Sequence, residues 1–262
     1  MTSIIHLFEN ERNFFSDPRV QQWTLMSTPL PTIFISLVYL ALVLVILPTY
    51  MKRRKPFDLS KIIRYYNIFQ IASCCFIIYR VLTSGWITGE LNLGCQPIDY
   101  SDNPKAVRMV GAFFWLYFLK MSELVETVFF VLRKKFNQVS GLHVYHHVST
   151  FCLAWIGCKF LGGGMASFPV IINSFIHIIM YSYYYLSSYG PKWQKKLAPW
   201  KPKLTMLQMI QFTILIIHSL TALLPSCHVP KQVLLLYVPN VLLVYKMFYD
   251  FYKTSYNKRR SA

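Results

Sequence analysis

The stretch Thr32-Ile-Phe-Ile-Ser-Leu-Val-Tyr-Leu-Ala-Leu-Val-Leu-Val-Ile-Leu-Pro-Thr-Tyr50 is followed almost at once by Lys52-Arg53-Arg54-Lys55. An apolar run of about 20 residues is long enough to cross a bilayer as a helix, and a basic cluster beside it is typical of a cytosolic loop. Six more apolar segments of similar length follow along the chain. The sequence therefore predicts an all-α polytopic membrane protein with seven transmembrane helices. The predicted spans are roughly 32–50, 62–84, 107–132, 143–160, 168–189, 204–224 and 232–252.

The composition supports the same class. The chain has 262 residues, 55% of them hydrophobic and only 14% charged, whereas about a quarter of the residues are charged in soluble domains. The connections between the apolar segments are too short for a second domain, so we predict one membrane domain over residues 1–262. The net charge of +17 comes from short basic runs between the spans, which favours a topological role and argues against a nucleic-acid partner.

The distribution of basic residues predicts the orientation. When the loops between the predicted spans are assigned alternately to the two sides of the membrane, the loops on one side carry 18 Lys and Arg residues and those on the other side carry six. Such a split follows the rule that cytosolic loops are enriched in basic residues. We therefore expect a lumenal or external N-terminus and a cytosolic C-terminus.

Two cysteines lie outside the predicted spans. Cys95 and Cys227 both fall in predicted lumenal loops, on the oxidising side of the membrane. We predict a disulfide that ties the loop between the second and third spans to the loop between the sixth and seventh. The alternative is a pair of free thiols.

The third span carries ionisable residues, which are costly in a bilayer and are functional candidates for that reason. Lys120, Glu123, Glu126 and Thr127 share one broad helical face. Lys120 can neutralise Glu123, one turn away. The alternative for this pair is a structural ion pair that only fixes helix packing.

The fourth span begins with His143-Val-Tyr-His146-His147. Positions i, i+3 and i+4 place three imidazoles on one patch of a helix. Histidine acts near neutral pH as a nucleophile, a base or a metal ligand. Three histidines within one turn are seldom mere hydrogen-bonding groups, so we take this patch as the candidate reaction centre.

Polar residues also line one side of the fifth span and begin the sixth. The stripe in the fifth span consists of Asn173, His177, Tyr181 and Tyr184. In the sixth span Gln208 and Gln211 are one turn apart, although glutamines in spans also serve to hold helices together. Together with the third and fourth spans, these groups predict a polar pocket reached from the cytosol, with apolar walls that accept a long alkyl chain.

Four ordered motifs carry a resemblance to a known family. They are Lys120-x-x-Glu123-x-x-Glu126-Thr127, Leu142-His-Val-Tyr-His-His147, Asn173-Ser-Phe-Ile-His177-Ile-Ile-Met-Tyr181-Ser-Tyr-Tyr184 and Thr205-x-x-Gln208-x-x-Gln211. In this order and spacing the chain resembles the ELO family of very-long-chain fatty acid elongases over nearly its whole length.

The resemblance implies an activity and a setting. Members of this family catalyse the condensing step of microsomal elongation, in which acyl-CoA and malonyl-CoA give 3-oxoacyl-CoA, CoA and carbon dioxide. We accordingly expect an endoplasmic reticulum enzyme whose seven helices enclose an acyl-chain tunnel, with malonyl-CoA and acyl-CoA as substrates and no tightly bound cofactor or metal. The expected partners are the reductases and the dehydratase of the elongation cycle, and a homodimer is left open.

The resemblance also suggests roles for the polar residues. His146 is the candidate nucleophile or base, with His177 facing it, and Glu123 and Glu126 orient the imidazoles. The candidate donors to an enolate are His143, His147, Asn173, Gln208 and Gln211. The candidate CoA-binding residues at the cytosolic mouth are Lys134, Lys135, Lys192, Lys195 and Lys196, for which topology alone is the alternative. The basic tail Lys258-Arg259-Arg260-Ser-Ala resembles an endoplasmic reticulum retrieval signal.

Two other function classes stay open at this point. A di-iron membrane desaturase or hydroxylase also uses a His-x-x-His-His motif, but it needs about eight ligands, and this chain has seven histidines, of which His6, His218 and His228 lie away from the cluster. A seven-helix receptor or a transporter fits the span count, and a transporter would use the buried acids and His177 as a proton relay.

Overall fold

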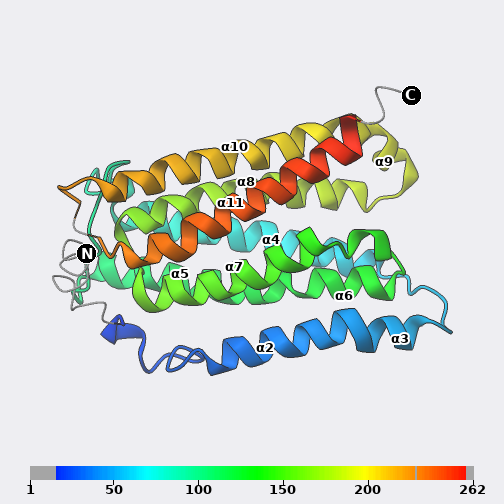
Figure 1. The fold of residues 1–262 in the computed structure, drawn as a ribbon, viewed down its shortest axis with the longest axis horizontal. Helices are drawn as coiled ribbons and strands as arrows, with labels where there is room; N and C mark the ends of the chain where they lie inside the picture. The colour runs from blue at the N-terminus through cyan, green and yellow to red at the C-terminus, as the bar shows by residue number, and fades with distance from the viewer. Residues whose placement is uncertain (1–15, 228, 258–262) are drawn as a thin grey trace, which may run out of the picture.

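The computed structural model describes residues 16–227 and 229–257, and within them the chain is a bundle of long, roughly parallel helices without strands (Figure 1). The rods of the bundle are α2 (Leu30–Ala41), which runs through a π-helical segment into α3 (Leu47–Met51), α4 (Ser60–Val81), α5 (Pro104–Glu123) followed by α6 (Val125–Leu132), α7 (Gly141–Phe160), α8 (Ser167–Ser187), α10 (Lys201–Leu220) and α11 (Gln232–Tyr252). The short helix α9 (Pro191–Leu197) connects α8 to α10. The predicted all-α class is confirmed. The basic tail Lys258–Arg260 lies outside the described residues.

Five helical stretches of the described chain are long and apolar enough to cross a membrane by length and composition alone, so the chain is a multi-pass membrane protein. They are Leu30–Met51, Ser60–Trp86, Gly164–Ser187, Pro191–Leu223 and Leu234–Tyr256. The two remaining rods, α5–α6 and α7, lie within the same bundle (Figure 1). They carry the buried acids and the histidine patch, which lower their hydropathy. The count of seven spans therefore stays a prediction.

Apolar side chains of α5 and α7 form the centre of the core. Val110 and Tyr117 of α5 and Phe151 and Cys158 of α7 are fully buried, and the rings of Tyr117 and Phe151 stack with centroids 5.1 Å apart. The Tyr117 hydroxyl also lies 2.9 Å from the Thr32 hydroxyl of α2. This hydrogen bond joins the outermost rod to the core, and its partners satisfy each other's polar atoms in an apolar setting.

Two loops are joined covalently at the end of the bundle opposite α9. Cys95, in the loop before α5, forms a disulfide with Cys227, in the loop before α11, and their Cα atoms are 5.6 Å apart. This is the pairing that the sequence predicts. Cys227 and Val229 are buried beside Cys95 and Met165, so the linked loops form a packed cap on this end, which we call the disulfide end.

The cap depends on a glycine between α7 and α8. The N–H of Met165 donates to the carbonyl oxygen of Gln96, 3.1 Å away. Gly164 has a φ of +53°, and a Cβ atom placed on it would lie 2.5 Å from the carbonyl oxygen of Pro97. Only glycine fits a left-handed position so close to another backbone segment.

We expect Gly164→Ala to destabilise the protein by roughly 1–3 kcal/mol, because alanine is strained at this φ and its methyl group meets backbone that cannot yield. The thermal unfolding midpoint in detergent micelles measures the effect. Gly141→Ala is the matched control, since a Cβ there meets nothing within 4 Å and alanine favours the helix. Equal midpoints for Gly164→Ala and the wild type would contradict this account.

Candidate functional site

The histidine patch occupies the first turns of α7. The hydroxyl of Ser140 caps the helix by accepting from the N–H of His143, 3.2 Å away, which satisfies one of the free donors at a helix start. The rings of His143 and His147 then lie one turn apart, with centroids separated by 4.2 Å. The ring of His146 stands nearly perpendicular to that of His147, at 5.5 Å. The three imidazoles therefore form one cluster.

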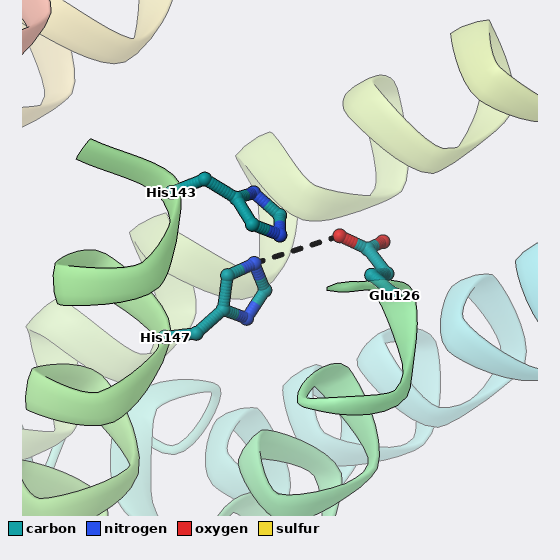
Figure 2. A group of neighbouring side chains, drawn as sticks. All are labelled: Glu126, His143 and His147. Atoms are coloured by element: carbon teal, nitrogen blue, oxygen red, sulfur yellow. Dashed lines mark ion pairs between the residues drawn. The ribbon is translucent and has the colours of Figure 1, made fainter. Parts of the chain in front are cut away.

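Glu126 of α6 faces two of these imidazoles. Figure 2 shows the side chains of His143 and His147 extending from α7 toward the carboxylate of Glu126. The Nε2 atom of His147 lies 3.6 Å from Oε2 of Glu126. Glu126 and His147 are both more than nine-tenths buried. This distance is longer than a hydrogen bond, so the two groups form a close buried pair in which the carboxylate acts on the imidazole through its charge.

Glu123 of α5 serves a different histidine. Its carboxylate accepts from the ammonium of Lys120 at 2.9 Å and 3.0 Å. Its Oε1 atom also lies 3.2 Å from Nδ1 of His177 on α8. All three side chains are buried. Lys120, Glu123 and His177 therefore form one buried charged group, which we call the Lys-Glu-His triad.

The break between α5 and α6 separates the two carboxylates. The α-helix α5 ends at Glu123 and α6 begins at Val125, and the N–H of Leu124 bonds to the carbonyl of Met121, three residues back. This is a local tightening of the helix. Glu123 then contacts α8 while Glu126 contacts α7. The chain thus supplies one carboxylate to each of the two histidine helices.

Thr127 links the cluster to α2. Its hydroxyl lies 2.9 Å from Nε2 of His143 and 2.7 Å from the hydroxyl of Tyr39. Thr127 is fully buried and Tyr39 is 4% exposed. Sequence analysis did not identify Tyr39, since a single tyrosine within an apolar span gives no signal of its own. This chain of hydroxyls holds the His143 ring in place.

An apolar cavity of about 220 Å³ begins at His146 and is lined by α5, α7, α8, α10 and α11. Lys120, Asn173 and Gln211 line it together with His146. The other end lies between the loops at the disulfide end and is lined by Ile98, Met165, Val229 and their apolar neighbours. Most of the lining is aliphatic or aromatic. We call this space the apolar cavity; its mostly apolar lining, with His146 at one end, suits an alkyl chain that has a polar head.

A second, more polar cavity of about 470 Å³ lies at the α9 end of the bundle, where α6 also ends (Figure 1). It reaches inward to Glu126, and its basic lining residues are Arg133, Lys135 and Lys201. Of the lysines proposed from sequence for CoA binding, only Lys135 is among the lining residues. The others, Lys134, Lys192, Lys195 and Lys196, lie outside the lining, and those on α9 are exposed.

The remaining polar residues identified from sequence occupy different surroundings. Tyr181 is fully buried, with its ring centroid 5.7 Å from that of His177. Tyr184 lines the second cavity. Gln211 is 3% exposed, whereas the amide of Gln208 lies 3.5 Å from the sulfur of Met180. Gln211 therefore lines the apolar cavity and Gln208 packs between helices α10 and α8.

Several residues that line the two cavities were not among the site residues predicted from the sequence. Tyr66 and Asn67 of α4 line the second cavity beside Glu126. The hydroxyl of Tyr145 donates to Asn240 of α11 at 2.8 Å, and Asn240 lines the apolar cavity. His218 lines the same cavity. Of these, only His218 had a chemical signal in the sequence, and its distance along the chain set it apart from the histidine patch.

A metal ion is a chemical possibility within this geometry. Glu126, His143 and His147 present ligand atoms that all lie within 4.8 Å of one another (Figure 2). Two imidazoles and a carboxylate match the donors that zinc and non-haem iron accept. However, Nε2 of His143 is already bonded to the Thr127 hydroxyl, so a metal would compete with this contact. This donor set is smaller than a di-iron centre requires.

The comparisons with known proteins agree with the motifs. Residues 24–262 match the family described as ELO, the GNS1/SUR4 family. The chain is 42% identical to very long chain fatty acid elongase 4 of Mus musculus over 94% of its own length and 78% of that protein. It is 38% identical to very long chain fatty acid elongase 1 of Homo sapiens, over 98% and 92% of the two chains. A very long chain fatty acid elongase of Aedes aegypti is 42% identical over 95% and 70%. The chain therefore belongs to the ELO family.

Proposed function

We propose that this protein is a fatty acid elongation enzyme and that it catalyses the condensing step, in which a fatty acyl-CoA and malonyl-CoA give 3-oxoacyl-CoA, CoA and carbon dioxide. The family and the elongase names of its relatives support the elongation role. One structural observation supports the condensing step most directly. His146 lies where the apolar cavity meets buried polar residues, so an acyl chain in the cavity presents its thioester to an imidazole.

In the first half-reaction we assign His146 the role of nucleophile. Its ring nitrogen attacks the thioester carbonyl, the carbon–sulfur bond breaks, and CoA leaves as the thiolate and takes up a proton. The acyl group is then held as an acyl-imidazole, which divides one difficult step into two easier ones. Lys120, Asn173 and Gln211 line the cavity beside His146, and we assign them as the donors to the developing oxyanion.

In the second half-reaction malonyl-CoA loses carbon dioxide, and the electron pair of the broken bond forms an enolate. The enolate carbon attacks the acyl-imidazole, the carbon–nitrogen bond breaks, and His146 is regenerated. Enolate charge is stabilised by fixed donors in a dry site, each contributing roughly 3–4 kcal/mol where such donors have been removed. We assign this task to Lys120, Asn173 and Gln211, which line the cavity beside His146. His147, 3.6 Å from Glu126, and His177, 3.2 Å from Glu123, are not among the residues that line it.

The second cavity is the proposed entrance for the CoA moiety. Its basic residues Arg133, Lys135 and Lys201 suit the phosphates of CoA, since guanidinium and ammonium groups bind phosphate by charge-assisted hydrogen bonds. The cavity reaches Glu126, next to the histidine patch. We propose no tightly bound cofactor.

Two experiments test the proposed function. The first is expression in an elongase-deficient host, followed by fatty acid profiling; we expect acyl chains two carbons longer than those supplied. The second is incorporation of radiolabelled malonyl-CoA by purified protein in the absence of reductant, where the expected product is the 3-oxoacyl-CoA. Absence of labelled product with every acyl-CoA length would reject the condensing step.

The metal alternative makes the opposite prediction for chelation. We expect condensation to continue at an unchanged rate after treatment with a strong chelator, because His143 is held by the Thr127 hydroxyl and the proposed steps need only imidazole chemistry. Condensation assays before and after chelation, together with metal analysis of the purified protein, measure this. Stoichiometric zinc or iron whose removal stops turnover would assign Glu126, His143 and His147 to a metal centre instead.

We further propose that the protein resides in the endoplasmic reticulum membrane with a lumenal N-terminus and a cytosolic C-terminus, and that it works with the reductases and dehydratase of the elongation cycle. The alternating basic loops support this orientation. Protease protection of epitope tags at the two ends in microsomes tests it: a protected C-terminal tag and an accessible N-terminal tag would reverse the assignment.

A further inference from the structure

His218 of α10 is a polar side chain in the apolar part of the cavity. Its ring lines the cavity, and the residue is 7% exposed. Neither Nδ1 nor Nε2 has a hydrogen-bond partner among the described residues. The ring of Phe168 on α8 packs against it at a centroid distance of 4.5 Å, and this contact satisfies no polar atom. A buried imidazole left in this state is unfavourable, because it has lost its hydrogen bonds to water.

The neighbouring polar group does not provide the missing partner. Ser219 also lines the cavity, but its hydroxyl donates to the carbonyl of Leu215 one turn back, at 2.7 Å. The residues lining the cavity around His218 are otherwise apolar, among them Leu215, Ala222 and Val229. The hydrogen-bonding capacity of His218 is therefore unused by the described protein and is available to a molecule that fills the cavity.

The position of His218 indicates which part of such a molecule it meets. His218 follows Gln211 by seven residues on α10, which corresponds to about 10 Å along the helix axis. An extended chain covers about 1.2 Å per bond, so this distance corresponds to roughly eight bonds. With the thioester beside Gln211 and His146, His218 meets the middle or distal part of the acyl chain, well away from the reacting atoms.

We propose that His218 forms a second binding position within the apolar cavity, one that takes a hydroxyl group carried on the acyl chain. A neutral imidazole offers one donor and one acceptor, and a hydroxyl group offers both as well, so the two can pair whichever ring nitrogen carries the proton. The proposal rests on the proposed function in one respect, namely that the cavity holds an acyl chain. It makes a hydroxylated acyl-CoA a preferred substrate over the unsubstituted chain of the same length.

The test compares saturated acyl-CoA substrates of one length that carry a hydroxyl group at successive carbons, with the unsubstituted chain as reference. Affinity is measured by displacement of a fluorescent acyl-CoA from the purified protein in detergent, and kcat/KM by condensation with malonyl-CoA. We expect a preference of roughly three- to tenfold for the hydroxylated chain, the range that one added hydrogen bond gives, and we expect it only for hydroxyl positions near the distance derived above.

Three variants assign the preference to His218. In His218→Phe the aromatic packing on Phe168 is kept and the hydrogen bond is lost, so the ratio between the two substrates should fall to about one. In His218→Asn a donor and an acceptor remain, and part of the preference should return. Ser219→Ala is the matched control on the same stretch of the cavity wall, and it should keep the wild-type ratio. Each ratio compares two substrates on one variant, so a general loss of activity does not imitate the result.

The outcomes separate this proposal from the proposed function. Equal affinity of the wild type for all hydroxyl positions and for the unsubstituted chain would overturn the proposal, because His218 would then bind water only. A preference that persists in His218→Phe would also overturn it. Displacement of the probe without any condensation product would count against the condensing step alone, and the affinity ratios would still decide the role of His218.

Discussion

Replacement of His146 by alanine should reduce condensation by about a thousandfold or more, since removal of a nucleophile leaves only binding and electrostatic stabilisation. His146 lines the apolar cavity with Lys120, Asn173 and Gln211, and no second imidazole lines that end of the cavity among the described residues. Initial rates of labelled 3-oxoacyl-CoA formation measure the loss. Intact-mass analysis of the wild type incubated with acyl-CoA alone should reveal a covalent acyl adduct, and this adduct should be absent from His146→Ala.

Ser149→Ala is the matched control for this variant. Ser149 lies on the same helix and donates to the carbonyl of His146 at 3.2 Å, yet it is absent from the lining of both cavities. We expect it to form product and adduct at rates close to those of the wild type. A wild-type rate in His146→Ala would remove His146 from the reaction. Loss of turnover with an intact adduct would move the nucleophile to another residue and leave His146 as a base.

Replacing only one charged member of the Lys-Glu-His triad, either Lys120 or Glu123, should lower the free energy of unfolding more than most single substitutions in this protein. Lys120 and Glu123 are 5% and 1% exposed, and their charged atoms are 2.9 Å apart. Lys120→Met or Glu123→Gln alone leaves an uncompensated buried charge, which costs about 3–5 kcal/mol. The double variant removes both charges and should lose much less than the sum of the single losses. Unfolding in mixed micelles by a denaturing detergent, run as a double-mutant cycle, gives the coupling.

The exposed pair Lys246–Asp250 provides the control for this cycle. Its charged atoms are also close, at 3.0 Å, but the side chains are 73% and 56% exposed. Water screens such a pair, so Lys246→Met should change the free energy of unfolding by less than about 1 kcal/mol. Single variants of Lys120 or Glu123 that are no more destabilised than Lys246→Met would show that this buried pair contributes nothing to stability.

Most helices could be predicted from hydropathy because their apolar stretches are continuous. The first predicted span, 32–50, corresponds to the helical rod Leu30–Met51, and the last, 232–252, coincides with α11. Helix α9 was missed, since Lys192, Lys195 and Lys196 resemble a basic loop and the segment is too short to show a periodic pattern. The break at Leu124 was missed as well. No glycine or proline marks it, so the local sequence gives no sign of it.

The site could be predicted in part because its chemistry is concentrated in a few residue types. Histidines and acids inside spans are expensive, and this drew attention to the residues from Lys120 to Thr127, to the patch around His146 and to His177. The partners of these groups were harder to find. Spacing alone gives no means of deciding that Glu123 meets His177 while Glu126 meets His147, because the pairing depends on how three helices are arranged around one another.

Cys95 and Cys227 are covalently bonded, and their loops supply Ile98 and Val229 to the far end of the apolar cavity. The far end of this space is thus formed by two covalently linked loops, while the end at His146 is formed by helices. Substitutions at loop positions such as Ile98 and Val229 should therefore change the depth of the apolar cavity without changing the residues around His146. Formation of this covalent link requires oxidation of two thiols, so the joining of the two loops depends on the redox state of the compartment in which they lie.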